Sequence, residues 1–97
     1  MSPRATIYKL RLYVAGDAQN SAQAVANLMA LCEEHLRDRY QIELVNVFRE
    51  PERALADAIF MTPTLLKLSP APVRRIVGTL SPMQVVLDAL GLKTNTE

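Results

Sequence analysis

The tetrapeptide Thr62-Pro63-Thr64-Leu65 decides the fold of this chain. Proline has a fixed φ and no backbone N–H, so within a sheet it is tolerated where a strand begins. A short apolar segment follows it, and we therefore predict that a strand begins at Thr64. Cis peptide bonds are almost confined to X-Pro. A proline that opens a strand opposite the N-terminus of a helix is a strong cis candidate, and we predict that the Thr62–Pro63 bond is cis. The segments on either side of this corner determine the topology.

The half of the chain that precedes the corner reads as strand, helix and strand. Apolar and polar side chains alternate along residues 6–14, as in a strand. The second face of this segment is also partly apolar, which indicates a central strand. A helix is expected over 22–40, capped by Asn20 or Ser21, and a second strand over 42–48. Such lengths imply a right-handed parallel βαβ unit. The predicted inward residues are Tyr8, Leu10, Leu12 and Val14 on the strand, and Val25, Leu28, Met29, Cys32 and Leu36 on the helix.

The half that follows contains shorter segments. Pro51 is expected to open a short helix that ends near Phe60, with Leu55 and Ile59 facing inward. Two strands are expected over 64–68 and 75–77, joined by a proline-rich turn. A last helix should begin at Ser81-Pro82 and end at Gly91, with Val85, Val86, Ala89 and Leu90 as its apolar stripe, before a frayed tail over 93–97. The resulting order, β-α-β-α-β-β-α, is that of a thioredoxin-like α/β fold, formed as a single domain over residues 1–97.

Composition limits the possible functions. The 97 residues include 11 basic and 10 acidic side chains, and this balance argues against nucleic acid or a membrane surface as a partner. One cysteine and one histidine exclude an internal disulfide, a CxxC centre and a zinc site with four Cys or His ligands. No apolar run approaches the ~18 residues of a membrane span. We expect a soluble cytoplasmic protein with no metal and no cofactor.

The usual chemistry of a thioredoxin-like fold is missing from the sequence. Its reactive thiolate belongs at the N-terminus of the first helix, but the stretch Gly16 to Ser21 contains no cysteine. Ser21 is more typical of a helix cap, Cys32 of a small buried hydrophobe, and His35 has no evident partner. We therefore expect a binding protein and no catalytic residue. A thiol- or glutathione-handling enzyme that uses Ser21 or Cys32 is the alternative.

Four stretches of the chain resemble the KaiB family of circadian-clock proteins. They are Leu12-Tyr13-Val14-Ala15-Gly16, Asn20-Ser21, Thr62-Pro63-Thr64-Leu65 and Pro72-Val73-Arg74-Arg75-Ile76-Val77-Gly78. The resemblance implies a non-catalytic protein that binds a KaiC-type hexameric ATPase. It also implies a metamorphic fold, with a thioredoxin-like monomer and a ground state of order β-α-β-β-α-α-β that forms dimers or tetramers.

The resemblance also assigns regions and residues. Residues 1–49 should be shared by the two states, residues 50–91 should refold, and residues 92–97 should form a tail. The candidates for cis-prolines and for the fold switch are Pro63, Pro70 and Pro72. The partner-binding candidates are Gln23, Glu43, Ala58, Arg74 and Arg75. Cyanobacterial members tend to carry basic residues at positions 23, 43 and 58, and this departure argues against KaiA as a partner. A sensor histidine kinase is a further candidate partner, and a kinase-docking module a further candidate role. The segment from Ser81 to Gly91 has clear signals for the start and the end of a helix, and it favours the thioredoxin-like state.

Overall fold

The sheet is mixed, and its spatial order is β2-β1-β3-β4. A computed structural model describes residues 6–92, and the predicted tail over 93–97 lies outside them. β1 pairs in parallel with β2 and antiparallel with β3, which pairs antiparallel with β4. The order β-α-β-α-β-β-α confirms the thioredoxin-like prediction. The elements are β1 (Tyr8–Val14), α1 (Gln19–His35), β2 (Tyr40–Asn46), α2 (Pro51–Ala56), β3 (Thr64–Ser69), β4 (Arg74–Val77) and α3 (Met83–Leu90).

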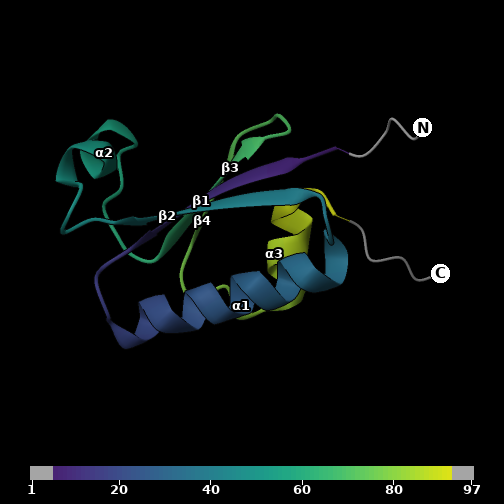
Figure 1. The fold of residues 1–97 in the computed structure, drawn as a ribbon, viewed down its shortest axis with the longest axis horizontal. Helices are drawn as coiled ribbons and strands as arrows, with labels where there is room; N and C mark the ends of the chain where they lie inside the picture. The colour runs from purple at the N-terminus through teal and green to yellow at the C-terminus, as the bar shows by residue number, and fades with distance from the viewer. Residues whose placement is uncertain (1–5, 93–97) are drawn as a thin grey trace.

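The helices divide between the two faces of the sheet (Figure 1). α1 and α3 cover one face, and the short α2 lies over one end of the other. The alternation of β1 supplies both layers, as expected of a central strand. Its even-numbered side chains enter the main core beneath α1 and α3, whereas Tyr13 packs with Val45, Ala54 and Leu66 on the α2 side.

The first helix is shorter than predicted. α1 ends at His35 instead of Tyr40, because Asp38 adopts a positive φ of 64° and the Arg39 N–H bonds to the carbonyl of Leu36 in a turn. Tyr40 is therefore free to begin β2, two residues before the predicted start. Neither Asn20 nor Ser21 caps the helix, because the N-cap position is Ala18.

Some predicted core positions are wrong. Met29 and Val85 are exposed, while Ala24, Leu31 and Leu87 are buried in their helices instead. The prediction that Leu55 faces inward is also wrong, because Leu55 is 76% exposed and Ala54 is the buried residue of α2. Small shifts of the buried stripe around a helix account for these errors, because neighbouring positions differ by ~100° in direction.

The ends of the later helices follow local backbone geometry. α2 ends at Ala56 and not near Phe60, because Ala58 adopts a positive φ of 55°. α3 begins at Met83, with Pro82 at its N-cap, and ends as predicted at Gly91. β3 begins at Thr64, and the Thr62–Pro63 bond is cis as predicted, as are Ser69–Pro70 and Ala71–Pro72.

Candidate functional site

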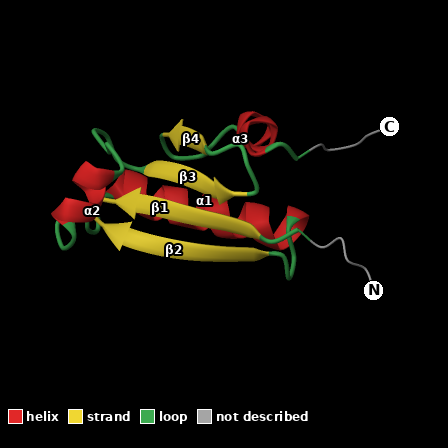
Figure 2. Ribbon diagram, turned by 90° about the horizontal axis from the view of Figure 1, so that it is seen from above, coloured by secondary structure: helices red, strands yellow, loops and turns green. Residues whose placement is uncertain are grey.

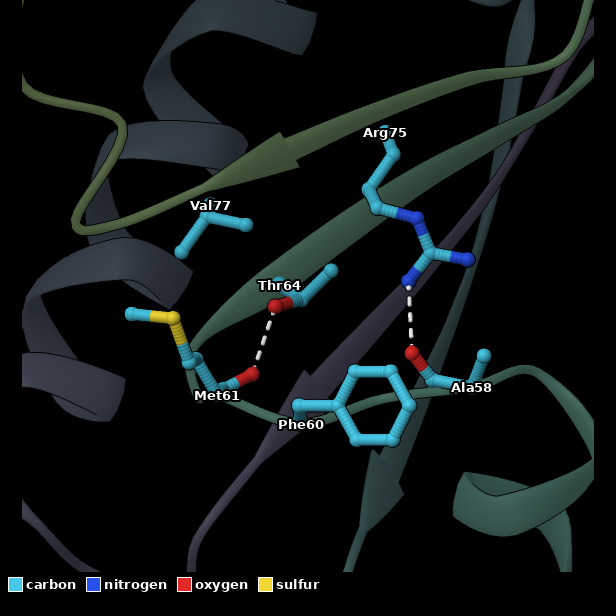
Figure 3. A pocket seen from close by; sticks show the side chains of 6 residues that line it. All are labelled: Ala58, Phe60, Met61, Thr64, Arg75 and Val77. Atoms are coloured by element: carbon cyan, nitrogen blue, oxygen red, sulfur yellow. Dashed lines mark hydrogen bonds between the residues drawn. The ribbon is translucent and has the colours of Figure 1, made fainter.

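A hollow of about 330 Å³ opens beside the Thr62-Pro63 corner (Figure 3). The loop after α2 contributes Phe60 and Met61, β3 contributes Thr64, and β4 contributes Arg75 and Val77. Phe60 is 86% exposed, and Met61 and Val77 are also exposed. Large apolar side chains gathered on a surface usually mark a binding site.

The backbone around this hollow is held in place by side chains. The Arg75 guanidinium donates to the carbonyl oxygens of Asp57 (2.8 Å) and Ala58 (3.1 Å), and the second bond is drawn in Figure 3. The Thr64 hydroxyl donates to the Met61 carbonyl at 2.6 Å. The loop between α2 and β3 is thereby fixed at both ends while the Phe60 ring stays in solvent. Such an exposed ring on an anchored loop is available for a partner.

The apolar surface continues past Phe60. A second hollow of about 240 Å³ shares Phe60 and Met61 with the first and extends to Phe48, which follows β2 and is exposed. We call Phe48, Phe60, Met61, Arg75 and Val77 together the corner surface. Aromatic residues, methionine and arginine are the residue types enriched at protein–protein interfaces.

A polar network lies beneath α2 and attaches it to the sheet. Arg11 of β1 bonds to Glu43 of β2 at 2.8 Å and to Asp57 at 3.0 Å, and the Tyr13 hydroxyl donates to Asp57 at 2.5 Å. Arg53 of α2 pairs with the same Glu43 at 2.5 Å. Hydrogen bonds from Tyr13 and Arg11 lower the pKa of Asp57, and those from Arg11 and Arg53 lower the pKa of Glu43. Both carboxylates are therefore stabilised in their charged form.

The structure separates the predicted partner-binding residues. Ala58 and Arg75 meet at the first hollow, and Arg74 adjoins them on β4. Glu43 belongs to the polar network, and Gln23 lies on α1, across the sheet from α2 (Figure 1). Phe48, Phe60 and Met61 were not predicted, because an apolar side chain at the end of a strand or beside the Thr-Pro corner reads equally well as core.

The two residues that the alternative enzyme hypothesis would use are both buried. Cys32 has no exposed surface, and burial raises the pKa of its thiol to about 12. A thiol in this state is inert, because the thiolate is the reactive form. The Ser21 hydroxyl is buried and accepts the N–H of Ala15 at 3.0 Å. Cys32 therefore cannot meet a substrate at the surface, whereas Ser21, although buried, borders a hollow of about 330 Å³ beside the start of α1.

Residues 6–92 provide neither a metal centre nor a membrane-spanning helix. No group of three or more His, Cys, Asp or Glu residues there could hold a metal ion. No helix in that range is both long and apolar enough to cross a membrane.

Solved structures show the same fold at low sequence identity. The N-terminal domain of SasA from Synechococcus elongatus aligns with all of this chain and 97% of its own, with a TM-score of 0.72 and 18% identity. Mitochondrial thioredoxin 3 from Saccharomyces cerevisiae aligns over 90% of this chain and 80% of its own, with a TM-score of 0.71 and 14% identity. These likenesses confirm the thioredoxin-like architecture.

Sequence relatives are far more similar. The circadian clock protein KaiB3 of Synechocystis sp. is 45% identical over 83 residues, covering 86% of this chain and 81% of the relative. The circadian clock oscillator protein KaiB of Prochlorococcus marinus is 47% identical over 92 residues, covering 95% of this chain and 76% of the relative. The KaiB domain matches residues 11–92. The resemblance expected from the sequence is confirmed, and the chain belongs to the KaiB family of circadian clock proteins.

Proposed function

We propose that this chain is a non-catalytic clock or timing regulator that binds a KaiC-type hexameric ATPase through the corner surface. The partner-binding residues would be Phe60, Met61 and Arg75 of the corner surface, together with Ala58 and Arg74 beside it. Ala58, Arg74 and Arg75 are among the candidates that the sequence suggested. Both the ATPase partner and the cytoplasmic location of this chain are inferred from family membership.

The corner surface is the observation that carries this proposal. It combines an 86% exposed phenylalanine with an arginine whose guanidinium is anchored to the backbone. Hydrogen bonds from Arg75 and Thr64 hold the backbone on both sides of Phe60, so less backbone freedom is lost when a partner buries its ring. The burial of Cys32 and Ser21 favours binding over thiol chemistry.

The direct test is co-elution with the cognate KaiC homologue in ATP and in ADP after prolonged incubation. Phe60→Ser should weaken the complex about tenfold or more, because it removes the most exposed aromatic ring of the surface. Val85→Ser is the matched control, since Val85 is exposed on α3 and lies outside the corner surface. If Phe60→Ser leaves complex formation unchanged, the corner surface is not the binding surface. If the wild-type protein forms no complex, a KaiC-type ATPase is not its partner.

We also propose that residues 50–91 can refold while residues 1–49 keep their structure. The second half leaves several large apolar side chains exposed: Leu55, Phe60, Met61, Val73, Val77 and Val85. An alternative packing that buries them, in a dimer or tetramer of the ground-state fold, needs to differ by only a few kcal/mol. Pro63, Pro70 and Pro72 all lie within this half.

Binding competition and activity assays test the remaining candidates. A sensor histidine kinase would compete for the same surface if it binds there, whereas KaiA stays disfavoured by Gln23, Glu43 and Ala58. A thiol- or glutathione-handling activity abolished by Cys32→Ala or Ser21→Ala would overturn the non-catalytic proposal.

A further inference from the structure

Met61 is the most exposed of the three methionines that the structure describes. It is 62% exposed, compared with 44% for Met29 on α1. Met83 on α3 is half-buried and packs against the main core (Figure 2 shows α3 beside the sheet). A thioether in solvent is open to peroxide oxidants, which convert methionine to its sulfoxide. The position of Met61 in the corner surface gives this reaction a consequence for binding.

The Met61 side chain lies where the two hollows of the corner surface meet, and it lines both of them. In Figure 3 its sulfur lies on the side of Val77, away from the Phe60 ring. The polar groups that line the first hollow are already engaged. The Thr64 hydroxyl donates to the Met61 carbonyl at 2.6 Å, and the Arg75 guanidinium donates to two backbone carbonyls. An oxygen added to the sulfur therefore enters an apolar lining whose donors are in use.

The one cysteine of the chain does not compete for the oxidant. Cys32 is fully buried, and burial raises the pKa of its thiol to about 12. Peroxides react with the thiolate, so this thiol is protected both by packing and by its bound proton. At a low dose, peroxide that reaches this molecule therefore reacts at an exposed methionine sulfur.

We propose that Met61 is an oxidation site that controls binding at the corner surface, with hydrogen peroxide as the oxidant. This inference rests on the proposed function, because it takes the corner surface as the surface that the ATPase covers. A lone pair of the sulfur attacks one peroxide oxygen, so that an S–O bond forms and the O–O bond breaks. The departing hydroxide takes the remaining proton and leaves as water. The thioether loses two electrons, and these reduce the peroxide.

The sulfoxide turns a flexible apolar side chain into a polar one. When the partner covers the corner surface, the new oxygen loses its water inside an apolar contact, which is unfavourable. We expect the dissociation constant of the complex to rise about tenfold. A methionine sulfoxide reductase reverses the change: a dithiol reductant becomes a disulfide, and the added oxygen leaves as water.

The site is tested first without any ATPase. Peptide mass spectrometry after graded doses of hydrogen peroxide should show that Met61 gains an oxygen faster than Met29 and several times faster than Met83. Circular dichroism at the dose that oxidises Met61 should show an unchanged fold, since this side chain lies outside the core. If Met61 reacts no faster than Met83, the proposal is overturned.

The control of binding is tested with the cognate KaiC homologue. Its dissociation constant is measured before and after this chain alone is treated with peroxide, and the peroxide is removed before mixing. The ratio of the two values should be about ten for wild type and for the matched control Met29→Leu, and about one for Met61→Leu. Treatment with methionine sulfoxide reductases and dithiothreitol should return the wild-type value.

The outcomes separate this inference from the proposed function. A wild-type ratio of one, or an equal rise in Met61→Leu, overturns the control by oxidation while the complex itself still supports the proposed function. A wild-type protein that forms no complex before treatment refutes the proposed function, and the control by oxidation falls with it.

Discussion

Lys67 is a buried cation at the centre of β3. Its side chain is 3% exposed, and its Nζ lies 3.5 Å from the Leu90 carbonyl at the end of α3 and 6.0 Å from the centre of the Tyr8 ring. No carboxylate pairs with it among residues 6–92. Burial, with a smaller effect of nearby Arg74, lowers the pKa of Lys67. A helix C-terminus and a ring face compensate a buried ammonium only in part.

We predict that Lys67→Met stabilises the fold by about 1 kcal/mol at pH 7, because removing a buried, unpaired charge is favourable. The pKa of Lys67 is lower in the folded chain than in the unfolded chain. At pH values between these two pKa values, the unfolded chain therefore binds more protons. Wild-type stability should therefore rise with pH across that alkaline window, and the variant should lack this rise. Urea unfolding from pH 7 upward measures both effects, with Lys9→Met as the exposed control. A variant less stable than wild type at pH 7 would contradict this account.

At the scale of elements, α2 depends on its contacts with the sheet. Its six residues are too few for an isolated helix, so the polar network beneath it supplies essential support. Asp57 receives the Tyr13 hydroxyl and the Arg11 guanidinium. We predict that Asp57→Asn lowers the free energy of unfolding by about 1–3 kcal/mol at neutral pH, because two partly buried donors lose their charged acceptor.

This loss should depend on pH. The folded pKa values of Asp57 and Glu43 lie below their unfolded values, so their stabilisation is present above the unfolded pKa and is lost as the pH falls through the folded pKa. The cost of Asp57→Asn, measured by urea unfolding, should therefore shrink below about pH 4. As a control, Glu34→Gln should lower the free energy of unfolding by less than about 0.5 kcal/mol, because Glu34 is an exposed carboxylate 3.8 Å from His35. An Asp57→Asn cost that is constant down to pH 2 would argue against the network.

The end of α3 depends on Gly91. Its φ is +80°, and the N–H groups of Gly91 and Leu92 bond to the carbonyls of Asp88 (3.1 Å) and Leu87 (2.8 Å). This left-handed end favours glycine, so Gly91→Ala should cost about 1 kcal/mol and lower the melting temperature by about 4–8 °C. Ala89→Ser, on the preceding turn, should have a smaller effect. An unchanged melting temperature for Gly91→Ala would mean that the helix end relaxes.

At the scale of the whole molecule, the proposed refolding predicts a division of the chain. NMR should show two slowly exchanging sets of amide signals for residues 50–91, because only these residues change secondary structure. Backbone shifts of the second set should indicate strand near the end of the chain and helix in place of β3. A single set for residues 50–91, independent of temperature and dilution, would speak against refolding.

The sequence named Ala58 and Arg75 as partner-binding candidates, and both line the first hollow beside the Thr62-Pro63 corner. Their role in partner binding stays a prediction. The polar network could not be predicted, because its residues are separated by up to 46 positions and meet only once α2 lies on the sheet. The exposure of Phe60 was equally hidden, since its burial depends on where α2 ends.

The sequence by itself determined the order of the elements and the position of the corner. Alternation along β1, prolines where elements begin and a glycine where α3 ends act locally, through φ, ψ and side-chain direction, and so can be read without a partner element. The tertiary structure alone decided that Leu55 faces solvent, that Lys67 is buried and that β2 has a free edge. These properties depend on which surfaces pack against one another, and residues far apart in the chain set them jointly.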